Sequence, residues 1–560
     1  MRLPRVLLWV VVALALIGWG CRKAEDASEK SAQQTAGSPT QTPSDAGEGA
    51  APTPGGRIVM ASIGEPSNLI PPLASDSASH DVADLLYVSL LRYDKNIQLE
   101  CMAAERYEVL DDGKLLKFWI KPGIHWTDGV ELTADDVEFT YKLMIDPKTP
   151  TAYAEDYKAV KSFTVTGKYS FEVRYAEPFA RSLVTWAGAI LPKHVLAGQD
   201  LLNTKYAREP VGAGPYTLAA WEPGRRLVLN ANPDYFEGRP YIDQVVYRII
   251  PDTSTMFLEL KAGGLDMMDL TPQQYLYQTK GSPWDADWRK FKYLSFIYTY
   301  MAYNLKSPFF QDRQVRQAIA HAVDKQAIVK GATLGLGVPT IGPYKPGTWM
   351  YDTAITDYAY DPALAKKMLA EAGWQDRNGD GVLEDASGRP FAFTILTNQG
   401  NDQRVKAATI LQSQLAAVGI KVSIRTVEWA SFIKEFVDKG NFDALILGWN
   451  ITQDPDVYDV WHSSKAVPGG LNFVGYKNPE VDALLDQGRH TLDQAKRKKI
   501  YDDFQVILHR DQPYLFLFAP YALPILSARI QNVAAAPAGI SYNFTKWWIP
   551  RDKQRFHLEK

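Results

Sequence analysis

Residues 442–461, FDALILGWNITQDPDVYDVW, contain a buried-strand pattern that runs directly into a polar and aromatic loop. The apolar run from Ala444 to Leu447 predicts a strand buried on both faces, because no polar residue interrupts it. The run ends at Gly448, and the residues after it are aromatic and polar. Loops at the carboxyl ends of buried strands in α/β folds line the crevice where ligands bind. We therefore predict a recognition loop after Gly448; the alternative is an ordinary polar loop with core aromatic residues.

Helices and strands alternate around this stretch. Asp361 to Gly373 is a predicted helix with an Asp N-cap, Pro at its first position and a terminal Gly. A second helix is predicted from Arg404 to Val418, followed by alternating apolar residues from Ile420 to Ile424 and another helix from Ala430 to Asp438. This order predicts an α/β fold with parallel strands.

The chain of 560 residues is too long for one hydrophobic core, so we expect two or three domains. It is 46% hydrophobic and 12% aromatic, with 15 Trp and 29 Tyr, which is typical of a globular protein rich in flat, hydrogen-bonding side chains. A net charge of -3 gives no electrostatic reason to expect nucleic acid as a partner. The two cysteines, Cys21 and Cys101, are too few for a disulfide framework.

The N-terminus has the pattern of an export signal. Arg2 and Arg5 precede an apolar run from Val6 to Trp19, which has the length of a signal-peptide core and is short for a membrane-spanning helix. We predict a signal peptide over residues 1–20. The small residue before Cys21 resembles a bacterial lipoprotein cleavage site, after which this cysteine would carry lipid; plain secretion and an uncleaved anchor are the alternatives.

The segment that follows Cys21 is a predicted tether. Residues 22–56 contain Ala, Ser, Thr, Gln, Gly, Pro and charged residues, with no aromatic ring. Such a segment buries too little apolar surface to offset its ordering entropy. We predict that 21–56 is a lipidated cysteine plus a disordered linker that holds an exported body at the cell envelope, as a periplasmic or cell-surface lipoprotein.

Several long motifs occur in a fixed order along the body. A hairpin is predicted from Glu105 to Lys121, and Thr133 with Asp136 forms a predicted helix N-cap. The motifs themselves are KPGIHWTDG at 121–129, ADDV at 134–137, PVGAGPY at 210–216, NANPDYFEG at 230–238 and NLKSPFFQDRQVRQAI at 304–319. Together they resemble the bacterial extracellular solute-binding proteins of family 5, which serve peptide, nickel and related ABC importers.

The resemblance implies a periplasmic-binding-protein type II fold, with two lobes joined by a hinge and an extra inserted domain. Lobe I is expected at 57–91, 209–285 and 513–560, the inserted domain at 92–208 and lobe II at 286–512. The chain is expected to return to lobe I along Tyr514 to Ala519. The implied function is the substrate-binding component of an ABC importer, a monomer that captures oligopeptides between its lobes and delivers them to the permease subunits.

The resemblance also implies which residues contact the ligand, although a structural role is the alternative for each. Lobe I is expected to contribute Glu65, Ser67 and Asn68, and Tyr303 lies near the crossover between lobes. Lobe II is expected to contribute Trp449, Asn450, Asp454, Asp456, Tyr458 and Asn472.

The sequence departs from dipeptide binders of this family at two anchors. Those proteins carry an Asp soon after the matching Gly-Trp, which pairs with the ligand amine, whereas Asn450 to Gln453 contains no acid. They also hold the ligand carboxylate with an Arg on the loop that aligns with Thr397 to Asn401, which contains none; Arg404 is assigned to the following helix. A strict dipeptide binder is therefore disfavoured. Asp454 or Asp456 could bind the amine, or the ligand could lack free termini.

Other ligands and functions stay open. A different solute, such as an oligosaccharide, a conjugate or a metal chelate, is the alternative within the family, and a ligand sensor or surface hydrolase is the alternative outside it. Bare nickel is disfavoured by the shortage of His near the expected cleft. The sequence has no nucleophile elbow, phosphate-binding loop or cysteine pair, and its eight His are scattered, so we expect neither enzyme activity nor a cofactor.

One motif resembles the start of a calcium loop. Asp376, Asn378 and Asp380 place oxygens at alternate positions, and Gly381 fits the sharp turn. Ser387 stands where the loop needs a bidentate Glu. We favour an Asx-rich turn before a strand from Phe391 to Leu396, with calcium as the alternative.

Overall fold

The computed structural model describes residues 51–450 and 453–556. The predicted signal peptide, Cys21 and most of the predicted linker lie outside the described residues. Within the described ranges, no helix is both long and apolar enough to cross a membrane.

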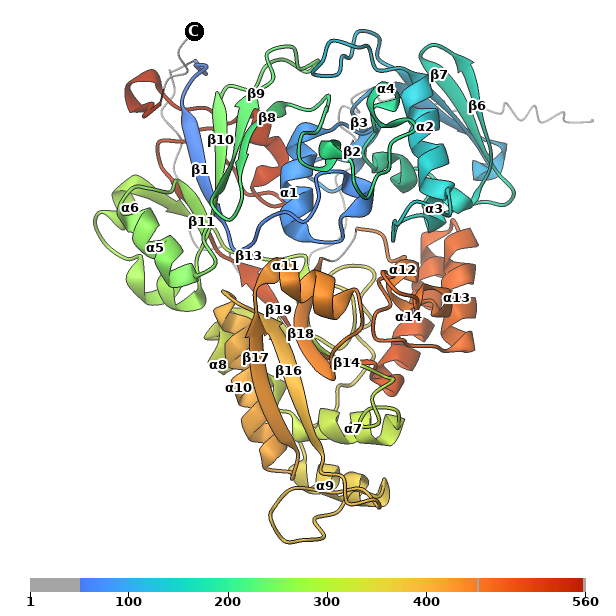
Figure 1. Cartoon of the computed structure of the whole chain (residues 1–560), viewed down its shortest axis with the longest axis vertical. Helices are drawn as coiled ribbons and strands as arrows, with labels where there is room; N and C mark the ends of the chain where they lie inside the picture. The colour runs from blue at the N-terminus through green and yellow to red at the C-terminus, as the bar shows by residue number, and fades with distance from the viewer. Residues whose placement is uncertain (1–50, 451–452, 557–560) are drawn as a thin grey trace, which may run out of the picture.

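The upper part of Figure 1 is built on a seven-stranded sheet, which we call the first sheet. β1 lies near its centre, parallel to β10 and β11. The strand order is β12-β20-β11-β1-β10-β9-β8, formed by β1 (Arg57–Ser62), β8 (Tyr216–Glu222), β9 (Arg226–Ala231), β10 (Gln244–Ile249), β11 (Met267–Asp269), β12 (Trp288–Lys290) and β20 (Pro524–Ser527).

The lower part is built on a second seven-stranded sheet. Its strand order is β13-β19-β14-β18-β16-β17, with β15 paired to β19; its strands are β13 (Tyr293–Leu294), β14 (Ile297–Tyr303), β15 (Gly337–Pro339), β16 (Ala392–Asn398), β17 (Lys421–Val427), β18 (Ala444–Asn450) and β19 (Tyr514–Ala522). The predicted parallel arrangement is confirmed for β16 with β17 and with β18. β14 runs antiparallel to β18, so the sheet is mixed.

The prediction that Ala444 to Leu447 is buried on both faces is confirmed. Side chains alternate across a strand, so Ala444 and Ile446 pack in a core that includes residues of α7 to α10. Leu445 and Leu447 pack on the opposite face, in a core that includes residues of α13 and α14.

The predicted helix caps are also confirmed. Thr133 and Asp136 form a reciprocal capping box at the start of α2, and Asp361 caps α9 with Pro362 at its first position. The predicted helix from Ala430 to Asp438 is confirmed as a helical segment, in which one α-helical turn, α11, continues directly into a wider helical turn at Phe432–Val437. The α-helices are α1 (Ser77–Leu86), α2 (Ala134–Ile145), α3 (Glu155–Lys158), α4 (Lys193–Leu196), α5 (Thr253–Lys261), α6 (Trp284–Asp287), α7 (Arg313–Ala322), α8 (Lys325–Thr333), α9 (Pro362–Glu371), α10 (Asp402–Ala416), α11 (Trp429–Ser431), α12 (Tyr458–Trp461), α13 (Pro479–His490) and α14 (Gln494–Asp511).

Two smaller sheets lie between β1 and β8 in the chain. The predicted hairpin is confirmed as β4 (Ala104–Leu110) and β5 (Leu115–Ile120), which join β6 (Val160–Gly167) and β7 (Ser170–Tyr175) in the order β4-β5-β7-β6. β2 (Leu91–Tyr93) pairs with β3 (Leu99–Cys101). In Figure 1 this region, with α2 and α3, lies directly above α13 and α14.

The chain passes between the two seven-stranded sheets at two adjacent points. One is between β12 and β13, and the other is between β19 and β20; β12 pairs with β20, and β13 pairs with β19. The expectation that Tyr514 to Ala519 returns to the first lobe is wrong, because β19 is paired with β14 inside the second sheet. The return occurs at Pro524–Ser527 instead. The remaining boundaries of the predicted lobes stay a prediction.

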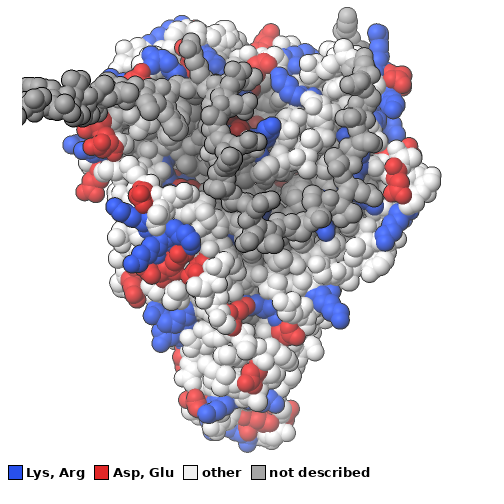
Figure 2. Space-filling model, turned by 180° about the vertical axis from the view of Figure 1, so that it is seen from behind, with Lys and Arg blue, Asp and Glu red and all other residues white. Residues whose placement is uncertain are grey.

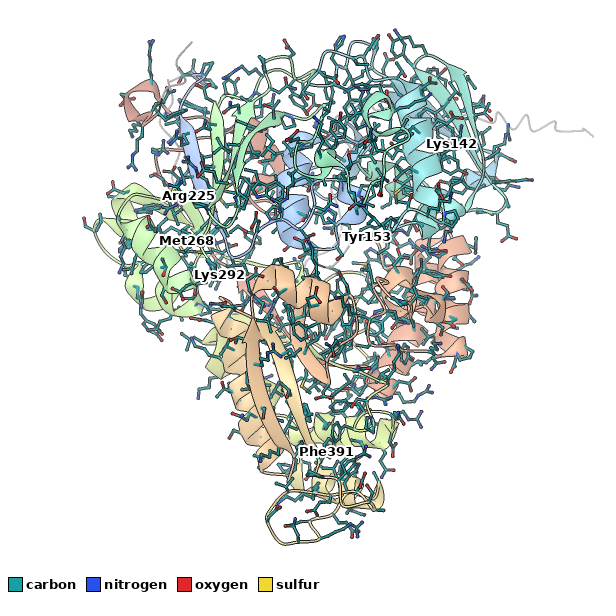
Figure 3. All side chains as sticks on the ribbon, viewed as in Figure 1. Lys142, Tyr153, Arg225, Met268, Lys292 and Phe391 are labelled. Carbon is teal, nitrogen blue, oxygen red and sulfur yellow. The ribbon has the colours of Figure 1, made fainter. Side chains whose placement is uncertain are left out.

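The surface carries charges of both signs. Figure 2, which views the molecule from behind, shows acidic and basic side chains interspersed on the described part of that face. Figure 3 places Met268 and Lys292 near the level where the chain crosses between sheets, Tyr153 at the boundary between the upper and lower parts, and Phe391 near the lower end.

Candidate functional site

A cavity of about 450 Å³ lies between the first and second sheets; we call it the central cavity. Backbone segments from both sides line it, including residues 61–64 and 268–271 on the first-sheet side and 400–404 on the second-sheet side. Its charged and aromatic side chains are those of Asp81, Tyr247, Asp269, Asp402, Arg404 and Trp429, and Asn450 adds an amide. It is therefore a cleft to which both halves contribute, as ligand pockets commonly are.

Arg404 is the basic side chain of this cavity. It lies in the first turn of α10, which begins at the carboxyl end of β16 and is capped by Asn401. Its Nη1 donates to Asn398 Oδ1 at 2.7 Å. Burial lowers the pKa of the guanidinium to about 10. Gly448 leaves room for it, since a Cβ there would lie 2.9 Å from Arg404 Nη2.

Two carboxylates line the first-sheet side. Asp81 lies on α1, and Asp269 lies at the end of β11. Water reaches both side chains, yet the surrounding protein raises the pKa of both carboxyl groups, that of Asp81 to about 7. The neighbouring acids Asp84, Asp269 and Asp76 add to the shift at Asp81. Both walls of the cavity thus carry ionisable side chains.

A smaller cavity of about 140 Å³ adjoins the loop after β18; we call it the side cavity. Asn450 lines both this cavity and the central cavity, so the two adjoin there. Trp449 and Tyr458 contribute rings, and Tyr153 faces them from the region above. Trp449 is held in place because its Nε1 donates to the Tyr514 hydroxyl at 3.3 Å.

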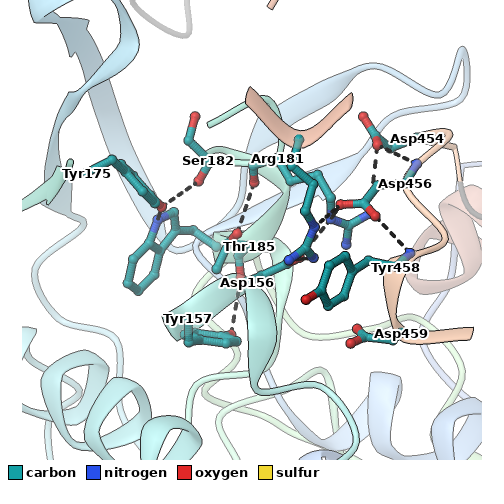
Figure 4. Close-up of polar contacts among 12 residues, drawn as sticks. Asp156, Tyr157, Tyr175, Arg181, Ser182, Thr185, Asp454, Asp456, Tyr458 and Asp459 are labelled. Atoms are coloured by element: carbon teal, nitrogen blue, oxygen red, sulfur yellow. Dashed lines mark hydrogen bonds and ion pairs between the residues drawn. The ribbon is translucent and has the colours of Figure 1, made fainter. Parts of the chain in front are cut away.

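The charges beside the side cavity form an ion-pair network that joins α3 and the segment after β7 to the second-sheet side (Figure 4). Arg489 Nη2 lies 2.5 Å from Asp156 Oδ1, and its Nε lies 2.7 Å from Asp456 Oδ2. Arg181 Nε lies 2.7 Å from Asp156 Oδ2 and 3.7 Å from Asp456 Oδ2. The Arg489 carbonyl also accepts from the Ala180 amide at 2.7 Å.

Asp454 extends the same network. Its two carboxylate oxygens accept from the two terminal nitrogens of Arg497 at 2.8 and 2.9 Å. Burial by itself raises the pKa of the Asp454 carboxyl, but the Arg497 hydrogen bonds and the Arg181 charge lower it overall. Similarly, burial alone would lower the pKa of Arg489, but Asp456 and Asp156 raise it.

The structure brings together only some of the predicted ligand residues. Trp449, Asn450, Asp456 and Tyr458 line the side cavity. The carboxylates of Asp454 and Asp456 are already paired with arginine side chains. Their predicted role in binding a ligand amine therefore gains no support from the structure and stays a prediction. Their pairing with Arg497 and Arg489 is the kind that holds segments together.

The three predicted residues of lobe I are held by their own surroundings. Glu65 accepts from Trp221 Nε1 at 2.5 Å and from the Gly224 amide at 3.0 Å. Ser67 donates to Asp76 Oδ2 at 2.5 Å, and Asn68 Oδ1 accepts from the Ile70 amide at 2.8 Å. These bonds shape the chain before α1, and ligand contact by these residues stays untested.

Tyr303 and Asn472 are buried away from both cavities. Tyr303 is fully buried and packs against Phe310, with 4.8 Å between ring centroids. Asn472 closes a turn by donating to the Tyr476 carbonyl at 2.8 Å and accepting from its amide at 3.0 Å. Both have structural contacts that account for their position.

The sequence did not point to several residues that line the cavities. Asp81, Asp269 and Trp429 were missed, and so were Tyr153 and Arg181 of the inserted region. One usable signal was present: Asp76 caps α1 by accepting from the Ser79 amide, which would have placed Asp81 on a helix. Arg404 was recognised, but its helix was not expected to point its first turn at the ligand.

The calcium candidate is a compact acidic loop. Asp376, Asp380 and Glu384 each offer an oxygen within 4.8 Å of the others. The oxygens of Asp376, Asn378 and Asp380 accept from backbone amides two to five residues ahead, which is the favoured Asx-rich turn. Calcium binding stays an untested alternative.

A larger hollow of about 710 Å³ lies on the outside of the second-sheet part and is lined by Arg313, Gln314, Glu371 and Lys477, among others. It is open and receives no residue from the first sheet. The central cavity is therefore the better candidate for a ligand that both halves contact.

Comparisons with known proteins all identify the same protein family. Residues 98–469 match the model for the middle region of the bacterial extracellular solute-binding proteins, family 5. The oligopeptide-binding protein AppA of Bacillus subtilis is 34% identical over 555 residues, which is 98% of both chains. The dipeptide-binding protein of Escherichia coli is 26% identical and covers 86% of this chain and 92% of its own.

Solved structures agree with the sequence matches. The structure of AppA from Bacillus subtilis in complex with a nonapeptide has a TM-score of 0.85 at 34% identity, covering 90% of this chain and all of AppA. The structure of NikZ from Campylobacter jejuni in complex with Ni(L-His) has a TM-score of 0.79 at 26% identity, covering 88% of this chain and 99% of NikZ. The same fold therefore holds both peptides and a metal complex in other proteins.

Proposed function

The chain belongs to the bacterial extracellular solute-binding proteins of family 5, and from this we propose that it captures oligopeptides in the central cavity for an ABC importer. The observation that carries the proposal is the cavity itself, which is lined by backbone and side chains of both sheets. A ligand there touches both halves at once.

Peptide binding fits the lining of the cavity. Buried peptide N–H and C=O groups each need a hydrogen-bond partner. The backbone segments 61–64, 268–271 and 400–403 line the cavity and offer such groups. Trp429 and the rings of the side cavity supply flat apolar surface for peptide side chains. None of the described residues that line either cavity is His or Cys, which favours an organic ligand over a bare metal ion.

The two chain segments that connect the sheets explain how a ligand could be captured between them. Within the described residues, two chain segments join the sheets, and they lie side by side, which is the arrangement expected of a hinge. A ligand that contacts both halves binds the closed arrangement more tightly than the open one, so it shifts the population toward closure. The closed form is then the state delivered to the permease.

A blocking substitution tests this proposal. Ala78 is the second residue of α1 and lines the central cavity. Ala78→Trp should fill the cavity and abolish binding of a random peptide library. Ala363→Trp is the matched control, since Ala363 is the exposed second residue of α9.

Binding can be measured by thermal unfolding and calorimetry. A peptide at 100 times its dissociation constant should stabilise the wild type by about 2.7 kcal/mol. Stabilisation of the Ala78→Trp variant equal to the wild type would refute the central cavity as the site. Failure of every peptide, together with binding of a sugar, conjugate or metal chelate, would replace the ligand class.

We also propose that lipid on Cys21 tethers a monomeric body to the envelope membrane. Cys21 and the predicted signal peptide lie outside the described residues, so support comes from the sequence pattern and the family. Metabolic labelling with a fatty acid should mark the wild type and leave Cys21→Ser unlabelled. Light scattering of the soluble body should give the mass of one chain.

A further inference from the structure

The ionisable side chains Asp81, Asp269 and Arg404 of the central cavity have no counter-charges among the described residues. No described acidic group lies within the 4.0 Å ion-pair limit of Arg404, whose side chain is bonded only to the Asn398 amide oxygen. Asp81 and Asp269 likewise have no ion pair with any described basic residue, although 38 such pairs occur elsewhere in the described chain. Unpaired charge is costly next to low-dielectric protein, so such groups are kept where something else pairs with them.

The charged side chains that line the first-sheet side are acids, whereas the second-sheet side carries the one cation, Arg404, together with the acid Asp402. The cation, Arg404, projects from α10 on the second-sheet side. The carboxylates, Asp81 and Asp269, project from α1 and β11 on the first-sheet side. They do not pair across the cavity with Arg404. The space between them therefore fits a ligand that carries opposite charges at two separated points.

We propose that Asp81 and Asp269 bind a cationic group of the ligand while Arg404 binds a carboxylate of the same ligand. The inference rests on the proposed function and specifies its substrate: a peptide with a free carboxyl terminus and a cation, supplied by its amino terminus or by a basic side chain. Arginine suits the carboxylate because its planar fork can donate two parallel hydrogen bonds. The loop acids Asp454 and Asp456 are not needed for the amine, since they are paired with Arg497 and Arg489.

Placing the two charges on opposite halves has a consequence for closure. A zwitterionic peptide is attracted to both halves, whereas a peptide blocked at either end is attracted to one. Closure should therefore depend on both ends of the ligand, and the charge selectivity should be larger than one ion pair alone would give.

Chemically blocked peptides test this inference on the full exported chain. Random pools of four, six and nine residues are prepared with free ends, with acetylated amino ends, with amidated carboxyl ends, and with both blocked. Each form is made with and without Lys and Arg. Retention by the protein after gel filtration is measured by mass spectrometry.

The wild type should retain the pool with free ends at least about tenfold better than the fully blocked pool that lacks Lys and Arg, which corresponds to a tenfold lower dissociation constant. If a basic side chain can supply the cation, acetylation should weaken the binding of pools that lack Lys and Arg and leave the binding of pools that contain them unchanged. If the amino terminus supplies the cation, acetylation should weaken the binding of both kinds of pool. Either result supports the inference, because in both cases a cationic group of the peptide binds to the carboxylates of Asp81 and Asp269.

Matched variants locate the effect. Asp81→Asn and Asp269→Asn should lose the discrimination against acetylated pools but keep that against amidated ones; Arg404→Gln should do the reverse. Asp503→Asn, an exposed and unpaired carboxylate on α14, should change neither. Thermal unfolding checks that each variant is folded.

Equal retention of free and fully blocked pools by the wild type would overturn the inference while leaving peptide capture intact. Discrimination that persists in both Asp variants would overturn the assignment of the cation to this wall. Failure of every pool to bind would refute the proposed function and the inference together, so the two failures are distinguishable.

Discussion

Charged side chains are paired with one another in the ion-pair network but lack ionic partners among the described residues in the central cavity. In the network, Asp156, Asp456 and Arg489 are buried and neutralise one another at 2.5 to 2.7 Å. In the cavity, Asp81 and Arg404 face water-accessible space with no ionic partner among the described residues. Paired charges hold segments of the chain together, whereas unpaired charges that line a cavity are available to a ligand.

The largest expected effect is on stability. Arg489→Met should lower the free energy of unfolding by about 3–5 kcal/mol, because it leaves the two buried carboxylates Asp156 and Asp456 with Arg181 as their one remaining described cationic partner. Urea denaturation measures this. Arg425→Met is the control, since Arg425 is exposed on β17 and should change stability by no more than about 0.5 kcal/mol. Adding Asp456→Asn to Arg489→Met should restore part of the loss; equal effects of the Arg489 and Arg425 changes would contradict the comparison.

The cavity arginine should behave in the opposite way. Arg404→Met removes a cation with no counter-charge, so the unliganded protein should keep its stability to within about 1 kcal/mol. Affinity for a peptide with a free carboxyl terminus should fall by about 10- to 100-fold, as expected for loss of hydrogen bonds to a charged group. Calorimetry on the folded variant checks it. A stability loss as large as that of Arg489→Met would remove the distinction between the two regions.

The pH dependence of stability should also differ between the regions. Desolvation by the surrounding protein, with the neighbouring acids Asp84, Asp269 and Asp76, raises the pKa of Asp81 from 3.8 to about 7. Between these values the folded protein holds a proton that the unfolded chain releases, so this group makes the unliganded protein less stable as pH rises from about 4 to 7. The network acid Asp454 has a lowered pKa and contributes the opposite slope only below about pH 4.

The measurement is the melting temperature from pH 5 to 8 for the wild type and Asp81→Asn. The variant should show a flatter profile, and an identical slope would argue against the raised pKa of Asp81. The difference between the two proteins isolates Asp81 from the other groups that surround it, which are Asp76, His80 and Asp84 on or beside α1, Asp269 on β11 and Tyr247 on β10.

The smallest expected effect concerns Gly448. A Cβ at this position would lie 2.9 Å from Arg404 Nη2 and 3.2 Å from the Tyr298 carbonyl. Gly448→Ala should displace the guanidinium and weaken peptide binding by about 1 kcal/mol or less. Because contacting residues are coupled, the double variant Gly448→Ala/Arg404→Met should bind peptide no more weakly than Arg404→Met alone. Additive losses in the double variant would show that Gly448 acts independently of Arg404.

Local patterns in the sequence predicted much of the architecture. The apolar run before Gly448, the Asp361-Pro362 start of α9 and the Thr133–Asp136 capping box are all formed by residues close together in the chain, and all are confirmed. The helix predicted from Ala430 to Asp438 is also formed, as one α-helical turn followed by a wider turn, whereas β19 was assigned to the wrong half. An apolar strand such as Tyr514–Ala522 fits either sheet equally well, so its residues alone do not select the partner.

The candidate site depended more on distant contacts. Trp449, Asn450 and Tyr458 were found because they follow one buried strand and line one cavity. Asp454 and Asp456 follow the same strand, but the arginines that pair with them come from residues 181, 489 and 497. Sequence spacing gives no measure of such pairing.

The sequence by itself determined the family, the alternation of helix and strand, and the strand that ends at the ligand loop. These depend on periodicity and on motifs of consecutive residues, which survive without knowledge of long-range contacts. Only the tertiary structure decided which acids are paired and which are open to a ligand. The free energy of a charge depends on what surrounds it in space, and the neighbours of Asp81, Asp456 and Arg404 are set by how the two sheets pack on each other, which the order of residues along the chain does not reveal.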